Sequence, residues 1–344
     1  MKKLSLFNKV IFLLNVFFAL VLVLSYTTQN IAPSSVGVSP LLSLVVPLLI
    51  LVNILFVSYW ILMGFKKQLF LSLIILIIGI FISPPLYKLG ADTSDSGKES
   101  LSILSYNVRK FNIFNWIKDE NISSEINSFV KNENPDIVVM QEFKKSKDFN
   151  LNYPYHYDHH DYSQAYKKDY PSGLVIFSKY PIINSGAVQF RRFYSSMIFT
   201  DIVKNKDTFR VYNFHLESLG VDPNREYFGH KDSQKLFDRL GRSFKTQQTE
   251  IETLNAHIAN CNYKVILAGD MNNTAYSWTY KNLKGNLQDS YVKRGNGFGR
   301  TYNFKGFPLR IDVIFADKKM KIIDHKNYDV HYSDHYPIMA TIEY

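Results

Sequence analysis

The chain has 344 residues, a formal net charge of +10 at neutral pH and one cysteine. A single cysteine excludes an intrachain disulfide, and the chain is long enough for a well-buried domain without one. The basic excess suits a phosphorylated polyanion or an anionic membrane surface, but ordinary surface lysines would give the same charge. Charge therefore does not identify a substrate.

Three long uncharged stretches, 10–26, 41–65 and 69–86, occupy the start of the chain. A helix needs about 20 apolar residues to cross the hydrocarbon core of a bilayer. We therefore expect residues 1–87 to form a membrane anchor of three transmembrane helices. A cleavable signal peptide would explain only the first stretch.

The basic residues around these stretches predict their orientation. Lys2, Lys3 and Lys9 precede the first stretch, and Lys66 and Lys67 separate the second from the third. Positively charged flanks stay in the cytoplasm. We expect an integral, multi-pass membrane protein with a cytoplasmic N-terminus, so that everything after the third span is extracytoplasmic.

After the anchor, residues 88–100 have the composition of a linker, and residues 101–344 are expected to form one domain. Several short apolar runs in this domain read as buried strands that end in polar residues. Residues 101–106 lead to Asn107, 136–140 to Gln141 and Glu142, 211–214 to His215, and 264–269 to Asp270 and Asn272.

Two further motifs lie near the C-terminus. A strand begins at Arg310-Ile311-Asp312, and a polar turn carries Ser333-Asp334-His335. An acid and a histidine side by side can serve a metal ion and a scissile phosphate from one loop. Asp312 could orient the His335 imidazole, because a histidine needs a partner on its far nitrogen to fix its tautomer.

In order and spacing, these motifs resemble the endonuclease/exonuclease/phosphatase superfamily, the deoxyribonuclease-like fold, from about Leu101 to Tyr344. The resemblance implies an α+β domain built as a four-layer αββα sandwich: two mixed β-sheets pack face to face, helices cover the outside, and the site lies at the top. It also implies a metal-dependent hydrolase acting on phosphoric ester bonds.

Phosphate esters resist attack, so such an enzyme needs a cation, a positioned water and donors for the developing charge. Mg²⁺ is the expected cofactor, with Mn²⁺ as the alternative. We expect Glu142 to be the principal metal ligand, since magnesium prefers carboxylate oxygens, and Asn107 and Asp334 to complete the site.

The resemblance assigns the remaining catalytic roles. Asp270 would hold or deprotonate the attacking water, and Asn272 would donate to a phosphoryl oxygen. His215 and His335 would flank the phosphate, with Asp312 behind His335. The residues alone leave open which of the two histidines exchanges the proton.

Further positions are weaker candidates. Arg109 matches a phosphate-facing arginine of several nuclease relatives, Gly173 matches a strand entry and is expected to matter for backbone geometry, and Arg310 is a candidate substrate contact. Gln247 and Gln248 lie on a predicted helix over 231–260. We expect them to be solvated rather than in contact with the site.

The sequence thus predicts a membrane-anchored phosphoesterase, with two substrate classes left open. Extracytoplasmic nucleic acid, cut as by an endonuclease or exonuclease, is favoured by Arg109 and the basic balance. A phospholipid, cleaved as by a sphingomyelinase-like phosphodiesterase or a headgroup phosphatase, is favoured by the membrane anchor. A non-catalytic binding module is disfavoured by the intact set of polar residues, and no protein partner can be inferred.

Overall fold

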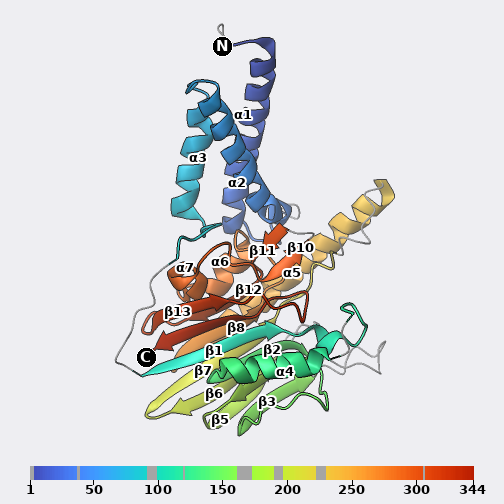
Figure 1. Ribbon diagram of the computed structural model, residues 1–344, viewed down its shortest axis with the longest axis vertical. Coiled ribbons are helices and arrows are strands. Elements are labelled where there is room, and N and C mark those ends of the chain that lie inside the picture. Colours follow the sequence, from blue (N-terminus) through green and yellow to red (C-terminus); the bar gives the residue numbers. More distant parts are fainter. Residues whose placement is uncertain are drawn as a thin grey trace.

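The computed structural model describes residues 4–36, 39–90, 99–118, 121–160, 173–189, 197–221, 230–304 and 307–344. Figure 1 shows three helices that rise from one end of a domain built around two β-sheets. The N-terminus lies at the far tip of the helices, and the C-terminus lies in the domain.

The three helices are α1 (Leu6–Thr27), α2 (Ser39–Leu62) and α3 (Leu69–Ile82). By length and composition, α1 and α2 could each cross a membrane. α3 has 14 residues, which gives about 21 Å and falls short of the roughly 30 Å hydrocarbon core. The sequence predicted an apolar span up to residue 86, but Pro84 and Pro85 follow, and a residue before proline avoids the helical conformation, so Ser83 is extended.

A buried polar node, formed by Asn15, Asn53, Trp60 and Ser72, joins the three helices. Asn15 Nδ2 donates to Ser72 Oγ at 2.6 Å, Ser72 Oγ donates to Asn53 Oδ1 at 2.7 Å, and Trp60 Nε1 donates to Asn15 Oδ1 at 3.0 Å. Polar groups buried among apolar helices must find partners in one another. The node therefore holds α1, α2 and α3 together as one bundle.

Two six-stranded sheets make up the centre of the domain in the described part of the chain. The first has the order β13-β14-β1-β2-β4-β3 and consists of β1 (Ser100–Asn107), β2 (Ile137–Phe143), β3 (Tyr155–His160), β4 (Gly173–Ser178), β13 (Lys321–Asn327) and β14 (Ile338–Glu343). The second has the order β5-β6-β7-β8-β12-β9 and consists of β5 (Ile182–Val188), β6 (Met197–Lys204), β7 (Asp207–His215), β8 (Lys264–Asp270), β9 (Gln288–Asp289) and β12 (Asp312–Ala316). A separate hairpin is formed by β10 (Tyr302–Phe304) and β11 (Phe307–Leu309).

Helices cover the outer faces of the two sheets, so the predicted four-layer αββα sandwich is confirmed (Figure 1). α4 (Ile122–Glu133) packs Ile122, Ile126 and Val130 on the first sheet, because a four-residue spacing places them on one helical face. The outer face of the second sheet packs on α5 (His230–Ala259) and α6 (Trp278–Lys284), and the short α7 (Ser290–Arg294) lies beside β13.

The strand directions gather the polar strand ends at one edge of the sandwich. β1 and β2 run parallel, with Asn107 opposite Gln141, and β7 and β8 run parallel, with His215 opposite Asp270. Parallel strands end at the same edge of a sheet. β12 runs antiparallel to β8 and begins at this edge, where Asp312 lies opposite Asp270.

The helical bundle packs directly on the domain. Thr274 Oγ1 donates to the carbonyl of Ser43 at 2.9 Å, and Tyr276 is buried in the same apolar cluster as side chains of the three helices. The predicted linker is ordered at its start, where Lys88 pairs with the backbone of Gly297. Its middle, 91–98, lies outside the described residues. The bundle is therefore docked on the domain and not connected through a tether alone.

Gly269 provides a test of this architecture. Its φ is +156°, and a Cβ atom there would lie 2.0 Å from the carbonyl oxygen of Phe214 on β7. We expect Gly269→Ala to lower the free energy of unfolding by roughly 3–5 kcal/mol, the upper range for single substitutions. Gly297→Ala is the control, since its φ is also positive but its Cβ would meet nothing within 4 Å. Denaturant unfolding of the detergent-solubilised chain measures both, and equal losses would contradict the packing described.

Candidate active site

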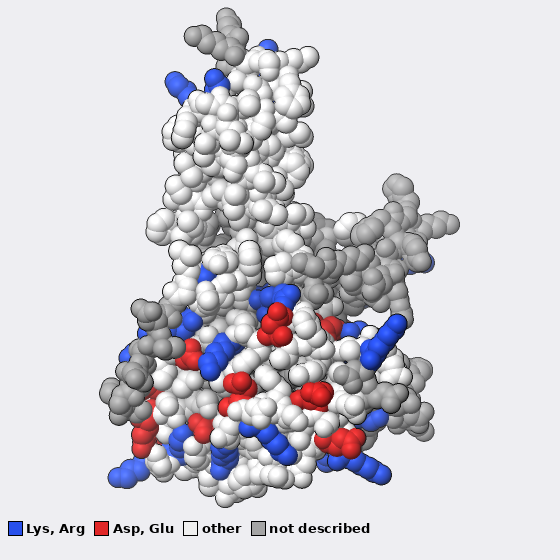
Figure 2. All heavy atoms as spheres, in the orientation of Figure 1, with Lys and Arg blue, Asp and Glu red and all other residues white. Residues whose placement is uncertain are grey.

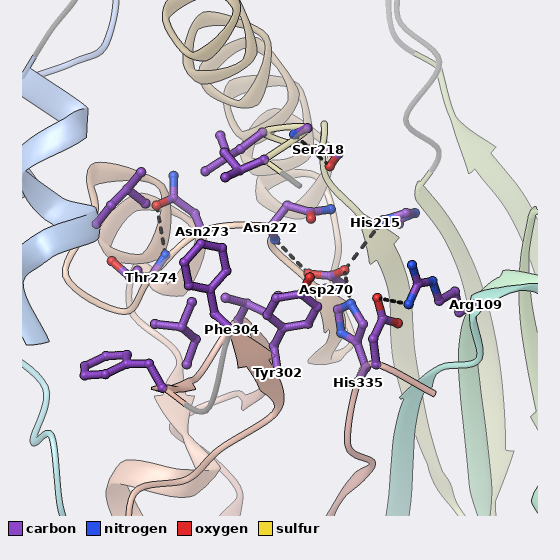
Figure 3. A pocket seen from close by; sticks show the side chains of 18 of the residues that line it. Arg109, His215, Ser218, Asp270, Asn272, Asn273, Thr274, Tyr302, Phe304 and His335 are labelled. Atoms are coloured by element: carbon purple, nitrogen blue, oxygen red, sulfur yellow. Dashed lines mark hydrogen bonds and ion pairs between the residues drawn. The ribbon is translucent and has the colours of Figure 1, made fainter. Parts of the chain in front are cut away.

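A cavity of about 680 Å³ opens at the edge where the strand ends meet. Its polar lining includes seven predicted site residues, from both sheets and from the loop before β14: Arg109, Glu142, His215, Asp270, Asn272, Asp334 and His335. Figure 3 shows Asp270 between His215, His335 and Asn272. The other two predicted catalytic and metal-site residues touch this group directly, Asn107 through Asp270 and Asp312 through His335.

The carboxylate of Asp270 is completely buried and lies at the centre of the group. Asn107 Nδ2 donates to its Oδ2 at 3.1 Å, and the backbone N–H of Asn272 donates to its Oδ1 at 2.7 Å. His215 Nε2 and His335 Nε2 lie 3.6 and 3.7 Å from Oδ2. Burial and the charge of Asp312 raise the pKa of Asp270, while the two histidines oppose the shift. A raised pKa suits a carboxylate that must accept a proton.

His335 is held by a second carboxylate. Its Nδ1 lies 3.0 Å from Asp312 Oδ2. Burial by itself would lower the pKa of His335, but the charges of Asp312 and Asp270, together with the hydrogen bond to Asp312, raise it to about 10. The ring is therefore protonated at neutral pH, so both of its nitrogens are donors. The ring of Tyr302, whose centroid is 5.0 Å away, packs against it.

Irregular backbone conformations position the side chains of Glu142 and Asn272. The register of β2 against β4 shifts between Met140 and Phe143, and Glu142 in this bulge has a φ of +49°. Gln141 is thereby buried, whereas Glu142 reaches the cavity. Asn272 has a φ of +48°, and its Nδ2 donates to the carbonyl of Leu216 at 2.9 Å. Positive φ at non-glycine residues costs about 1–3 kcal/mol and is concentrated at functional sites.

A buried amide network ties the two sheets together beneath the cavity. Asn213 on β7 donates to the carbonyls of Met140 and Val175 in the first sheet, at 2.8 and 2.9 Å. Gln141 Nε2 donates in turn to Asn213 Oδ1 at 2.7 Å. Sequence reasoning identified Gln141 only as a neighbour of Glu142 and missed Asn213, whose sole signal is a polar residue within an apolar strand.

Residues 104–335 match the family model described as Endonuclease/Exonuclease/phosphatase family. The chain belongs to this family. It is accordingly a phosphoesterase hydrolase, and the predicted membership is confirmed. Residues 8–85 match a domain of unknown function, and a comparison with curated proteins found no match.

Solved structures of the endonuclease/exonuclease/phosphatase fold are similar to the domain. A family protein from Beutenbergia cavernae has 14% identity and a TM-score of 0.52, with 72% of each chain covered. A humanized D. rerio TDP2 has 18% identity and a TM-score of 0.52, covering 71% of this chain and 99% of its own. The mannosyl-6-phosphatase of Bacteroides thetaiotaomicron has 18% identity and a TM-score of 0.51, covering 71% and 100%. At such low sequence identities, the structural similarity supports the fold alone.

Enzymes of this family depend on a divalent metal, and two sets of side chains could hold one. Glu142 and Asp334 place carboxylate oxygens, which hard cations prefer, on the cavity wall next to Asn107. Asp270, Asp312 and His335 also offer one atom each within 4.8 Å of one another. In this second set, His335 Nδ1 and Asp312 Oδ2 already lie in hydrogen-bond contact at 3.0 Å.

Of the three weaker candidates, one lies at the cavity and two lie away from it. Arg109 lines the cavity, pairs with Asp334 at 2.8 Å and lies over the ring of Trp116. Gly173 begins β4, buried and away from the cavity lining, in agreement with a role in backbone geometry. Arg310 also lies away from this cavity, buried and paired with Asp289 at 2.8 Å. Its expected contact with substrate is therefore replaced by a structural role.

Gln247 corrects another expectation. It is completely buried on α5, and its Nε2 donates to the carbonyl of Glu217 at 2.8 Å, while its Oε1 accepts from Asn273. It thus fixes the loop that follows Asp270. The signal was present in the sequence: Gln247 falls on the helical face that carries Phe244, Ile251 and Leu254. Gln248, by contrast, is partly exposed.

The amide network makes a testable prediction. Asn213→Leu removes two donated bonds and leaves Gln141 Nε2 without Asn213 Oδ1, at a cost of about 2–4 kcal/mol in the free energy of unfolding. Asn255→Leu is the matched control, since Asn255 is exposed on α5. Chemical unfolding monitored by tryptophan fluorescence provides the comparison. A loss no greater than that of the control would show that the network does not hold the sheets together.

Proposed function

We propose that this phosphoesterase is a membrane-anchored, Mg²⁺-dependent enzyme that hydrolyses a phosphate ester outside the cytoplasm. The observation that supports it is the convergence of Glu142, His215, Asp270 and His335 on one cavity. Carboxylates for a cation, a buried carboxylate for a proton and a cationic donor are the parts that attack on a phosphate ester requires.

Each residue has a role in the proposed reaction. Asp270 holds the attacking water and accepts its proton, because its pKa is raised and it lies at the centre of the group. His335, kept protonated by Asp312, donates to the phosphoryl oxygens as charge develops. His215 flanks the phosphate from β7, and Asn272 donates to it from the loop after β8.

Glu142 is the proposed principal ligand of Mg²⁺, with Asn107 and Asp334 beside it. A bound Mg²⁺ would polarise a phosphoryl oxygen and neutralise part of its charge. Arg109 holds Asp334 in place through their 2.8 Å ion pair. Mn²⁺, which accepts similar oxygen ligands, is the expected substitute.

The bundle supports the membrane location. Exposed apolar side chains run along all three helices, and Figure 2 shows almost no charge between the tip of the bundle and the domain. Lys9, Lys66 and Lys67 lie at the end of the bundle away from the domain. Since basic flanks stay in the cytoplasm, the domain would lie on the opposite side of the membrane.

Substrates of two classes fit the catalytic residues. D. rerio TDP2, a structural neighbour at a TM-score of 0.51, has been solved with a single-strand DNA product, and Arg109 lines the cavity here. This supports a nuclease as the second candidate. Helix α2 supplies part of the cavity wall, which favours a phosphate ester presented at the membrane surface, such as a phospholipid.

The role of His335 predicts a large kinetic effect. His335→Ala should lower kcat/KM for bis(p-nitrophenyl) phosphate by about 10²–10⁴-fold, because a group that donates in the transition state is lost. His331→Ala in the same loop is the control, since its side chain is 71% exposed. Circular dichroism checks that both variants are folded. Full activity in folded His335→Ala would refute the assignment.

The proposed metal ligand makes a separate prediction. Glu142→Gln should raise the Mg²⁺ concentration that gives half-maximal activity by at least about tenfold, and a chelator should abolish activity of the unaltered enzyme. Glu125→Gln, at an exposed position on α4, should leave the Mg²⁺ dependence unchanged. An unaltered Mg²⁺ requirement in Glu142→Gln would place the metal elsewhere.

A further inference from the structure

The cavity has an apolar part that hydrolysis itself does not require. The catalytic side chains occupy one end, while the apolar lining comes largely from Leu44, Val45 and Leu48 of α2 and from residues of the β10–β11 hairpin, including Phe304 and Phe307. Figure 3 shows Phe304 and Tyr302 beside Asp270, between it and Thr274. Helix α2 and the β10–β11 hairpin, which are far apart in the sequence, thus extend the cavity away from the catalytic side chains.

The apolar lining from α2 and the hairpin forms one wall of the cavity, and its α2 side continues along the helix into the bundle. Val45 and Leu48 are 39% and 51% exposed, and Leu51 and Leu55 farther along α2 are 45% and 60% exposed. Spacings of three and four residues place Leu48, Leu51 and Leu55 on one face of the helix. Exposed apolar side chains therefore continue from the cavity along α2, and this helix runs toward the tip of the bundle (Figure 1).

The position of α2 is fixed relative to the catalytic residues. The 2.9 Å hydrogen bond from Thr274 to Ser43 joins α2 to the loop that carries Asn272 and Asn273. Thr274 and Asn273 line the same cavity as Leu44. The apolar wall is thus built into the site.

The charges of the wall distinguish among substrates. Among the described residues that line the cavity, the one lysine or arginine is Arg109, at the catalytic end. A nucleic acid carries a negative charge at every nucleotide and needs cations along its path. A hydrocarbon chain needs apolar surface and no charge.

From these observations, and resting on the function proposed above, we propose that α2 forms part of the substrate site and that the substrate is a lipid phosphoester. Its phosphate lies at Asp270 and His335, and its hydrocarbon chain lies between α2 and the β10–β11 hairpin. In the reaction, the oxygen of water bonds to phosphorus and the bond from phosphorus to the leaving oxygen breaks. One proton of the water goes to Asp270, which then releases it to solvent, and the leaving oxygen takes up a proton from solvent.

Two chromogenic esters that share a scissile bond test this proposal. The full chain in nanodiscs is given p-nitrophenyl methyl phosphate or p-nitrophenyl hexadecyl phosphate, and nitrophenolate release gives kcat/KM for each. Burying about four methylenes should favour the hexadecyl ester by about 100-fold. Partition into the disc also favours it, so the decisive quantity is the change of this ratio in variants of the wall.

Leu48→Gln on α2 and Phe304→Ala on the hairpin should each lower the hexadecyl-to-methyl ratio by about tenfold. Ile61→Gln is the matched control: Ile61 is 39% exposed on α2 but lies outside the cavity lining and is not three or four residues from Leu48, Leu51 or Leu55. It should leave the ratio unchanged, because partition into the disc is the same for all variants.

The possible failures can be told apart. If the unaltered chain cleaves both esters in a Mg²⁺-dependent manner but the wall variants leave the ratio unchanged, the lipid site is refuted and the phosphoesterase stands. Faster cleavage of single-stranded DNA, insensitive to Leu48→Gln, would refute the lipid site in favour of a nuclease. If neither ester nor DNA is cleaved, the proposed function fails and the lipid site fails with it.

Discussion

The carboxylate of Asp270, removed from water between two β-sheets, is the constraint on which the site depends. A buried charge is costly unless partners surround it. Its partners come from β1, from β7, from the loop after β8 and from the loop before β14, through Asn107, His215, Asn272 and His335. The carboxylate is satisfied only when both sheets have closed on each other, so folding of the sandwich and assembly of the site are one event.

Much of this arrangement follows from the sequence. Apolar runs that end in Asn107, Glu142, His215 and Asp270 indicate strands, and parallel strands bring their ends to one edge. The sequence pattern does not show which side chain in one sheet bonds to which group in the other sheet. Asn213 looks like a lapse in an apolar strand, yet it bonds to two strands of the opposite sheet, and that pairing exists only once the sheets have packed.

The same limit explains the errors in the sequence reasoning. Arg310 adjoins Asp312, which orients His335, but its own side chain faces away from the cavity and pairs with Asp289. Strand alternation would place residues 310 and 312 on one face, but Arg310 precedes β12, which begins at Asp312, so the alternation does not apply to its side chain. The contact of Thr274 with Ser43 is likewise invisible in the sequence, since 230 residues separate Ser43 in the apolar helix α2 from the loop after β8.

The polar node in the bundle has a consequence for the cavity. A helix that slips by one residue relative to its neighbours turns by about 100°, which would carry Leu48 out of the cavity and present another side chain. Two hydrogen bonds oppose such a turn, from Ser72 to Asn53 and from Trp60 to Asn15, because each can form at only one rotation of α2 about its axis. Residues of the bundle that lie outside the cavity thereby determine which side chains of α2 line it.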